Sequence, residues 1–310
     1  MSRVSPVDIV ELIQMVRASQ KYGAIDEDLI RGIGLRELAA RGTLKEAVKA
    51  TKNKLHQVAG AYLDARPPYD EWLSALVEAD DGGRTTEDDR EPRAENREPT
   101  DDGGRTTGDR PLGDEHSKLK TQNSKLALVC REIMRHHAST RERLPFLGSF
   151  YATALAGIGP IRSVLDVACG LNPLALPWMP FGADVAYDAC DIYADMVEFL
   201  NGFFRIAGVR GQAQVCDLIS NPPRQPVDLA LVLKVFPPLD QLKKDAGRDL
   251  LRALDAPYLL VSFPARSLGG RDKGMASSYE ARFRALAEAE GWAIERFIFP
   301  TELAFLVRRE

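Results

Sequence analysis

Three aspartates occur where three consecutive predicted strands end. Asp166, Asp191 and Asp217 each belong to a short apolar run or lie close behind one. The carboxyl ends of parallel strands meet at one edge of a sheet, so side chains placed there can surround a single ligand. Carboxylates accept hydrogen bonds from hydroxyl and amino groups. One such aspartate is usually a surface or capping residue, but three in this pattern predict a site for a small organic molecule that carries hydroxyl and amino groups.

The loop after the first of these strands limits the identity of that molecule. It contains one glycine, Gly170, and lacks the GxGxxG pattern that cradles a pyrophosphate. S-adenosylmethionine has no phosphate but has an ammonium, a carboxylate, a sulfonium, a ribose and an adenine. We therefore expect Asp166 near the ammonium and Asp191 on the ribose hydroxyls. Asp217 would accept from the adenine amino group, with Leu218 against the ring.

Strands and helices alternate throughout the second half of the chain. Parallel strands joined by helices form a sheet that is covered on both faces and binds its ligand at the carboxyl ends. Two consecutive strands at the end of the chain indicate an antiparallel edge hairpin. The order predicts an α/β fold and resembles class I, the Rossmann-like, seven-stranded fold of S-adenosylmethionine-dependent methyltransferases. The expected strands are 163–168, 185–192, 212–218, 227–235, 258–264, 294–299 and 303–308, and the last helix is 277–290.

Residues 1–79 have helical patterns with short breaks and are expected to form an N-terminal helical domain. Thr43 and Glu46 have the spacing of a capping box at the start of the third helix. Cations recur along one face of this helix at spacings of four, three and four: Lys45, Lys49, Lys52 and His56. Repeated cations at this spacing suit the phosphates of a nucleic acid, although such a row is also typical of a solvated helix face.

The segment between the two halves differs in composition. Residues 80–116 carry 13 acidic and 6 basic side chains, a net charge of −7, in a chain whose net charge is −4. They contain two copies of DDGGRTT and almost no apolar residues, so they cannot bury enough surface to offset the entropy of ordering. We expect an acidic disordered insertion with no chemistry of its own, or alternatively an interaction tail. Residues 117–310 would then form the methyltransferase domain.

Composition limits the class of protein further. Hydrophobic residues make up 45% of the chain and charged residues 28%, which is typical of a globular protein. No apolar run approaches the roughly 20 residues that cross a bilayer. The four cysteines have neither CxxC spacing nor the density of a disulfide scaffold. We expect a cytoplasmic, monomeric protein with packed thiols and no membrane contact.

Several segments resemble one enzyme family. These are HASTRERL at 137–144, DVACGLNPL at 166–174, SFP at 262–264 with SLGG at 267–270, and KLHQV at 54–58. Together they resemble the aminoglycoside-resistance 16S rRNA guanine-N7 methyltransferases, which include the Arm, Rmt and Sgm types. The resemblance covers essentially the whole chain except residues 80–116.

The resemblance implies a set of residues around S-adenosylmethionine as the cofactor. In it, Arg143 pairs with the carboxylate of the cofactor, and Arg141 is the second choice for that role. A solvated pair with Glu142 is the alternative for both arginines. The implied set is Tyr62, His137, Ala138, Ser139, Arg143, Ala168, Asp191, Asp217, Leu218, Leu233 and Gln241.

The resemblance also implies methyl transfer to N7 of the decoding-site guanine (guanine 1405) of 16S rRNA in the 30S subunit, which gives aminoglycoside resistance. N7 carries an in-plane lone pair, so no proton has to be removed, and neither a general base nor a metal is expected. Catalysis would depend on alignment, with the target base turned out of its stack. The alternatives are a methyltransferase for another RNA or a small molecule, and a non-catalytic ribosome-binding protein that keeps the cofactor fold.

A second basic segment follows the fifth strand. The loop after Pro264 combines three cations with three glycines, which suits close contact with RNA phosphates, although a plain mobile loop is the alternative. Phe236 and Phe263 are candidate platforms for the target base, or core aromatics. The residues expected to bind RNA are Lys45, Lys49, Lys52, His56, Arg266, Arg271 and Lys273.

Overall fold

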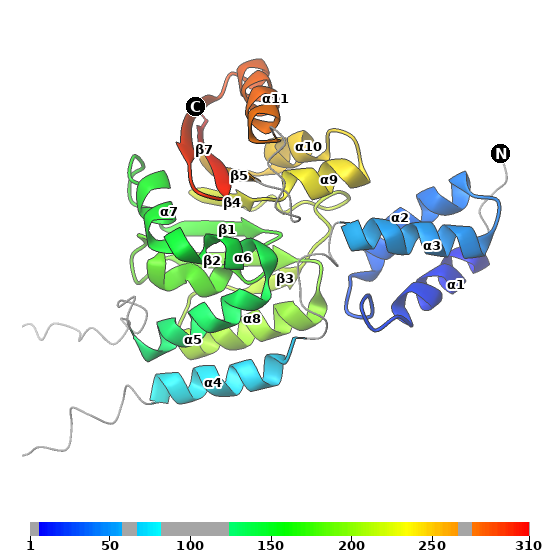
Figure 1. Cartoon of the computed structure of the whole chain (residues 1–310), viewed down its shortest axis with the longest axis horizontal. Helices are drawn as coiled ribbons and strands as arrows, with labels where there is room; N and C mark the ends of the chain where they lie inside the picture. The colour runs from blue at the N-terminus through cyan, green and yellow to red at the C-terminus, as the bar shows by residue number, and fades with distance from the viewer. Residues whose placement is uncertain (1–5, 58–66, 82–123, 266–274, 310) are drawn as a thin grey trace, which may run out of the picture.

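Seven strands form one sheet in the order β3-β2-β1-β4-β5-β7-β6 (Figure 1). The computed structural model describes residues 6–57, 67–81, 124–265 and 275–309. Neighbouring strands from β3 to β5 are parallel, and β7 lies antiparallel between β5 and β6. This confirms the predicted seven-stranded α/β fold. The strands are β1 (Ser163–Val167), β2 (Ala186–Asp191), β3 (Ala213–Val215), β4 (Leu229–Leu233), β5 (Tyr258–Pro264), β6 (Ala293–Ile298) and β7 (Glu302–Arg308).

The burial of each strand follows from its place in the sheet. The central strand β4 is buried at all five positions, because a parallel strand is covered on both faces. The edge strand β6 is exposed or half-buried along its length. The other edge strand, β3, is shorter than the expected 212–218, and Asp217 begins a turn in which its side chain accepts from the backbone N–H of Ile219 (2.8 Å).

Alternate residues of the central strands face two separate hydrophobic cores. On β4, Leu229, Leu231 and Leu233 belong to one core, and Ala230 and Val232 belong to the other. Side chains from α5 (Lys125–Ile133), α7 (Leu147–Ala154) and α8 (Ala194–Ala207) complete the first core. Side chains from α10 (Ala246–Ala253) and α11 (Met275–Glu290) complete the second. The remaining α-helices of residues 124–309 are the short α6 (Ala138–Arg143) and α9 (Phe236–Leu242).

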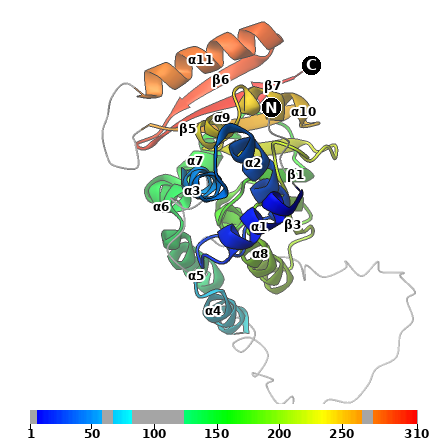
Figure 2. The ribbon, with the colours of Figure 1, turned by 90° about the vertical axis from the view of Figure 1, so that its right-hand side faces the viewer.

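The first three helices lie beside the sheet: α1 (Pro6–Arg17), α2 (Glu27–Ala40) and α3 (Leu44–Leu55). The side chain of Thr43 accepts from the backbone N–H of Glu46 (3.3 Å), which confirms Thr43 as the N-cap, and the Glu46 carboxylate accepts from the Thr43 hydroxyl (3.0 Å). Asp26 caps α2 in the same way by accepting from Leu29 N–H (2.9 Å). Figure 2 shows these helices in front of the sheet.

The fourth helix, α4 (Tyr69–Asp81), packs on the sheet half of the chain. Tyr69 stacks on Phe199 of α8 with ring centroids 5.1 Å apart, and Trp72 meets the same ring edge-on at 5.6 Å. Most of this helix was expected within the N-terminal helical domain, yet its aromatic face contacts α8. It also includes residues 80 and 81 of the predicted insertion, and residues 82–116 lie outside the described residues.

Among the described residues, no helix combines the length and the apolar character needed to cross a membrane. All four cysteines are free thiols, and Cys130, Cys169 and Cys190 are buried. This agrees with the expectation that the thiols pack as small apolar groups.

Candidate cofactor site

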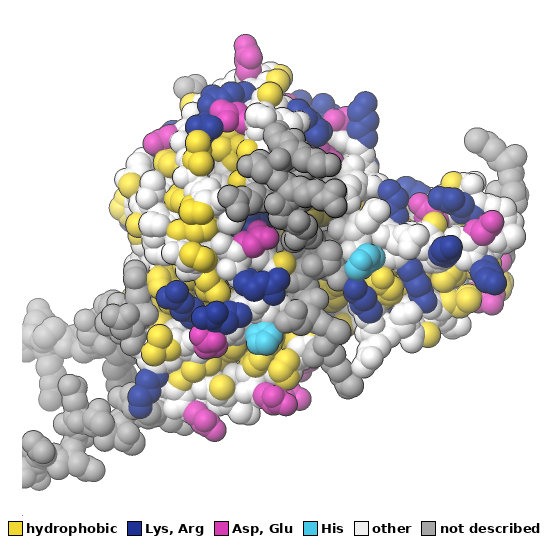
Figure 3. Space-filling model, viewed as in Figure 1, with side chains coloured by type: hydrophobic (Ala, Val, Ile, Leu, Met, Phe, Trp, Pro, Cys, Tyr) yellow, Lys and Arg dark blue, Asp and Glu magenta, His cyan; other side chains and the backbone are white. Residues whose placement is uncertain are grey.

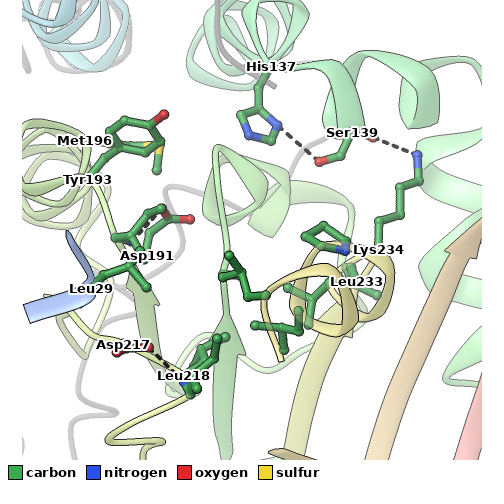
Figure 4. A pocket seen from close by; sticks show the side chains of 17 residues that line it. Leu29, His137, Ser139, Asp191, Tyr193, Met196, Asp217, Leu218, Leu233 and Lys234 are labelled. Atoms are coloured by element: carbon green, nitrogen blue, oxygen red, sulfur yellow. Dashed lines mark hydrogen bonds between the residues drawn. The ribbon is translucent and has the colours of Figure 1, made fainter. Parts of the chain in front are cut away.

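A pocket lies at the carboxyl edge of the sheet, where the segments after β1, β2, β3 and β4 converge (Figure 4). Its empty space measures about 760 Å³ with the open mouth included. Its walls are mostly apolar, with a few polar groups. The lining residues are Leu29, His137, Ser139, Ala168, Asp191, Ile192, Tyr193, Met196, Asp217, Leu218, Ile219, Leu233, Lys234, Val235, Pro238, Leu239 and Leu242.

The turn after β1 brings its backbone to the pocket. Ala168 and Gly170 both have positive φ angles, of 48° and 52°. A Cβ atom on Gly170 would lie 2.6 Å from the ring of His137, so only glycine fits beneath this imidazole. His137 is also hydrogen-bonded through Nδ1 to Ser139 Oγ (3.1 Å). His137, Ser139 and Ala168, which are among the predicted cofactor residues, all line the pocket.

Asp191, the last residue of β2, directs its carboxylate into the pocket. Its Oδ2 accepts from Gly170 N–H (2.9 Å) and its Oδ1 from Ile192 N–H (2.7 Å). Burial raises the pKa of the Asp191 carboxyl, although the backbone N–H groups around it act in the opposite direction. Each oxygen keeps a second lone pair, so the oriented carboxylate can accept from two neighbouring hydroxyl groups of a ligand.

Asp217 and Leu218 lie at the end of the same pocket away from His137 (Figure 4). Both side chains are buried, and Asp217 is fixed by its bond to Ile219 N–H. Leu233, at the end of β4, adds to the apolar wall. A carboxylate beside apolar side chains suits a flat ring with an amino group, as expected from the sequence.

Asp166 does not lie in the pocket, contrary to the sequence-based expectation. It is 1% exposed, and its Oδ2 accepts from Tyr187 Oη–H (2.7 Å) and Asn172 Nδ2–H (2.9 Å). Burial raises the pKa of Asp166 to about 7, against the lowering effect of these two hydrogen bonds. The expected contact with a ligand ammonium is therefore wrong for this arrangement, in which Asp166 holds the loop through Asn172.

Arg143 also differs from expectation. Its Nε and Nη2 donate to the two carboxylate oxygens of Glu302 (3.1 and 2.6 Å), and its Nη1 donates to Asn172 Oδ1 (2.8 Å). It is 1% exposed and does not line the pocket. The guanidinium fork that was expected to bind a cofactor carboxylate therefore faces Glu302 instead. Arg141, the second choice, is exposed and donates to the carbonyl of Arg135 (3.0 Å).

Lys234 is a pocket residue that the sequence analysis did not assign to the cofactor. Its Nζ donates to Glu142 Oε2 (2.7 Å) and to the carbonyl of Ser139 (3.3 Å), and it lies 3.4 Å from Glu302 Oε2. Among the described residues that line the pocket, it is the only lysine or arginine. A cation at the end of a continuous apolar strand was the signal that could have identified it.

Three predicted cofactor residues remain, of which two lie outside the pocket lining and one lies outside the described residues. Ala138 is buried at the start of α6, next to the pocket but not in its lining, and Gln241 is exposed on α9 outside the lining. Tyr62 lies outside the described residues. Leu29 and Tyr193 also line the pocket, but the local sequence does not distinguish either from an ordinary core residue.

The basic row on α3 is present as predicted. Lys45, Lys49 and His56 are exposed, whereas Lys52 is half-buried and donates to Ser19 Oγ (2.6 Å). Figure 3 shows Lys and Arg side chains distributed over the N-terminal helices. The second basic set, Arg266, Arg271 and Lys273, lies outside the described residues.

Both candidate aromatic platforms are core residues. Phe236 and Phe263 are buried, and their ring centroids lie 5.4 Å apart. Phe263 also stacks on Tyr279 at 5.2 Å.

Comparison with known proteins agrees with this architecture. The family model described as ribosomal RNA methyltransferase (FmrO) matches residues 104–306. A 16S rRNA (guanine(1405)-N(7))-methyltransferase of Frankia casuarinae is 37% identical over 298 residues, which cover 96% of this chain and 92% of the relative. A protein of the same name from Micromonospora echinospora is 31% identical over 312 residues and covers both chains fully.

Solved structures give the same result. The 16S rRNA methyltransferase RmtF, in complex with S-adenosyl-L-homocysteine, superimposes with a TM-score of 0.74 at 26% identity and covers 100% of both chains. The 16S rRNA methylase RmtB has a TM-score of 0.69 at 25% identity and covers 99% of this chain and 100% of its own. The resemblance stated from the sequence segments is thereby confirmed, and the chain belongs to the ribosomal RNA methyltransferase (FmrO) family.

Proposed function

We propose that this protein transfers a methyl group from S-adenosylmethionine to N7 of guanine 1405 in 16S rRNA and thereby gives resistance to aminoglycosides. The observation that carries the proposal is the pocket in which Asp191 and Asp217 are held at the ends of neighbouring strands. The names of the full-length relatives support the choice of target. The S-adenosyl-L-homocysteine complex of RmtF supports the choice of cofactor.

The pocket residues fit the parts of S-adenosylmethionine. Asp191 is oriented by two backbone N–H groups, so it suits the ribose hydroxyls. Asp217 and Leu218 suit the amino group and ring of adenine. His137 and Ser139 enclose the remaining side of the pocket with the backbone at Ala168.

The role of the protein in the reaction is to align the methyl donor with guanine N7. S-adenosylmethionine, when bound, supplies an electrophilic methyl group on a sulfonium. Because guanine N7 already has a free lone pair, the protein needs only to hold the donor still and exclude water. The apolar side chains of Val235, Pro238 and Leu239 form part of the pocket wall and suit the exclusion of water.

We further propose that the N-terminal helices bind rRNA and that the substrate is the 30S subunit in the cytoplasm. Exposed Lys45 and Lys49 on α3, and exposed His56 directly after it, suit backbone phosphates. Residues 266–274, outside the described residues, would add Arg266, Arg271 and Lys273. We expect a monomer to suffice, because a single chain holds all the residues of the described pocket.

Expression in an aminoglycoside-sensitive bacterium tests the proposal. We expect growth on kanamycin and gentamicin, together with 7-methylguanine at position 1405 of 16S rRNA by cleavage mapping. The Asp191→Ala variant should give neither. Resistance without the modified base would contradict the proposal.

Substrate choice is tested separately with labelled S-adenosylmethionine. Purified protein should label 30S subunits and leave tRNA and small metabolites unlabelled. Labelling of tRNA or a metabolite alone would favour the alternative methyltransferase activity. Tight 30S binding without any transfer would favour a non-catalytic ribosome-binding protein.

A further inference from the structure

The N-terminal helices are joined to the edge of the pocket by backbone hydrogen bonds. Asp26 N–H donates to the carbonyl of Ile192 (2.8 Å), and Ala194 N–H donates to the carbonyl of Ala24 (2.9 Å). Between them, Ile25 and Tyr193 form an isolated antiparallel bridge. Residues 192–194 directly follow Asp191, so the segment before α2 is paired with the segment that carries the ribose-binding carboxylate.

Two further contacts lie along the same edge of the sheet. The Nζ of Lys54, on α3, donates to the carbonyl of Gln241 on α9 (2.9 Å). A Cβ atom on Gly32 of α2 would lie 4.0 Å from Ser220 Oγ, in the turn after β3. The N-terminal helices therefore reach the segments that follow β2, β3 and β4, which are the segments that build the pocket.

Leu29 enters the pocket from this side. It lies in the first turn of α2, where its N–H is bound by the capping carboxylate of Asp26 (2.9 Å). Its side chain is buried and lines the pocket. Figure 4 shows Leu29 beside Asp191, on the side toward Asp217. This is the part of the pocket that suits the ribose and adenine.

We propose that Leu29 is a cofactor-binding residue, through which the N-terminal helices form one wall of the adenosine site. The inference rests on the proposed cofactor and goes beyond it. A ligand that contacts both halves of the chain stabilises their contact, and by thermodynamic linkage the contact strengthens binding of the ligand to the same extent. Donor binding would thus hold α2, and the basic row on the neighbouring α3, in place against the sheet.

Calorimetric titration of the full chain with S-adenosylhomocysteine tests the contact. The Leu29→Ala variant removes apolar surface from the pocket wall, and we expect about tenfold weaker binding. Ile33→Ala is the matched control, because Ile33 is buried on the same helix one turn later and does not line the pocket. It should bind S-adenosylhomocysteine within about twofold of the unmodified chain.

Hydrogen exchange tests the coupling without enzyme activity. S-adenosylhomocysteine should slow amide exchange in residues 24–33 of the unmodified chain and should slow it much less in Leu29→Ala. Circular dichroism of both variants checks that the helices remain folded.

Three results would overturn the inference. These are unchanged affinity in Leu29→Ala, equal losses in Leu29→Ala and Ile33→Ala, and binding to the unmodified chain with no slowing of exchange in residues 24–33. If the unmodified chain does not bind S-adenosylhomocysteine at all, the proposed cofactor is wrong, and the inference falls with it.

Discussion

Arg143 and Glu302, 159 residues apart in the chain, form a buried bidentate ion pair. The Nη2–Oε1 distance is 2.6 Å, and the two side chains are 1% and 0% exposed. Lys234 lies 3.4 Å from the same carboxylate, and Ser262 Oγ–H donates to it. Burial alone would raise the pKa of Glu302, but attraction by Arg143 and Lys234 and the hydrogen bonds it accepts outweigh this, so its pKa is lowered. The pair links α6 to β7, and Glu302 also contacts the pocket residue Lys234.

Arg143→Met is expected to destabilise the protein by about 3–5 kcal/mol, because it leaves Glu302 buried with fewer partners. Chemical denaturation measures the free energy of unfolding. The control is Arg31→Met, which breaks an exposed pair with Glu27 and should cost less than about 1 kcal/mol. Equal costs in the two variants would show that the buried pair has no special role.

Asp166→Asn should change the pH dependence of stability. Because the pKa of Asp166 is raised to about 7 in the folded protein from about 3.9 when unfolded, the folded state holds an extra proton between these values. The contribution of Asp166 to the free energy of unfolding is therefore fully present below about pH 4 and is lost as pH rises toward 7. Asparagine mimics the neutral acid, so the variant should lose less stability than the unmodified chain over this range.

Thermal unfolding at several pH values measures that difference. Asp28→Asn is the control, because the side chain of Asp28 is 85% exposed on α2. A decline with pH that is identical in the Asp166→Asn variant and the unmodified chain would contradict the assignment.

Gly170→Ala should damage both stability and cofactor binding. It combines a positive φ of 52° with a Cβ atom only 2.6 Å from the His137 ring, so we expect a loss of about 2–4 kcal/mol. The control is Gly208→Ala, where φ is 65° but nothing lies within 4 Å of the added atom; it should cost only about 1 kcal/mol.

The clash itself can be isolated with a double variant. Gly170→Ala combined with His137→Ala should cost less than the sum of the two single changes, because the ring is no longer present. Additive costs, measured by denaturation, would mean that backbone strain alone explains the effect.

Asp191→Ala should weaken binding of S-adenosylhomocysteine by about 100-fold or more. In the proposed complex it would remove two charge-assisted hydrogen bonds to the ligand, each of about 1.5–3 kcal/mol, and it leaves the N–H groups of Gly170 and Ile192 without their acceptor. Calorimetric titration measures the affinity. Asp188→Ala is the matched control on the same strand, since Asp188 accepts from Gln212 N–H outside the pocket. Near-equal affinity in the two variants would remove Asp191 from the ribose site.

The sequence predicted the strands and the pocket residues that lie at the last position of a strand or just after it. Apolar runs mark buried strands, and a residue that follows such a run lies at the ligand edge whatever the tertiary detail. Asp191 and Asp217 belong to this group. Asp166 shows the limit: it is one residue inside the end of β1. Side chains alternate between the faces of a strand, so Asp166 lies on the same face as Val164 and points into the protein.

Residues brought together by tertiary contacts could not be predicted from local pattern. Nothing around Arg143 indicates Glu302, which reaches it only through the antiparallel insertion of β7 between β5 and β6. Leu29 is likewise placed by a tertiary contact that its local sequence does not indicate. Its sequence context predicts a core residue of a helix, and only the pairing of residues 24–26 with residues 192–194 brings it to the cofactor pocket.

Reversing the charges of Lys45, Lys49 and Lys52 to Glu should weaken binding to 30S subunits by at least about tenfold and leave S-adenosylhomocysteine affinity unchanged. These side chains lie on α3 and are absent from the pocket lining. If all three contact phosphates, the dependence of log affinity on log salt should also become shallower by about 2–3. The control reverses Lys125, Arg131 and Arg205, which are exposed on α5 and α8, and changes the net charge equally. Filter binding at several salt concentrations separates the two explanations, because a loss from net charge alone would be the same in both variants, whereas a phosphate-binding face would be lost only with α3.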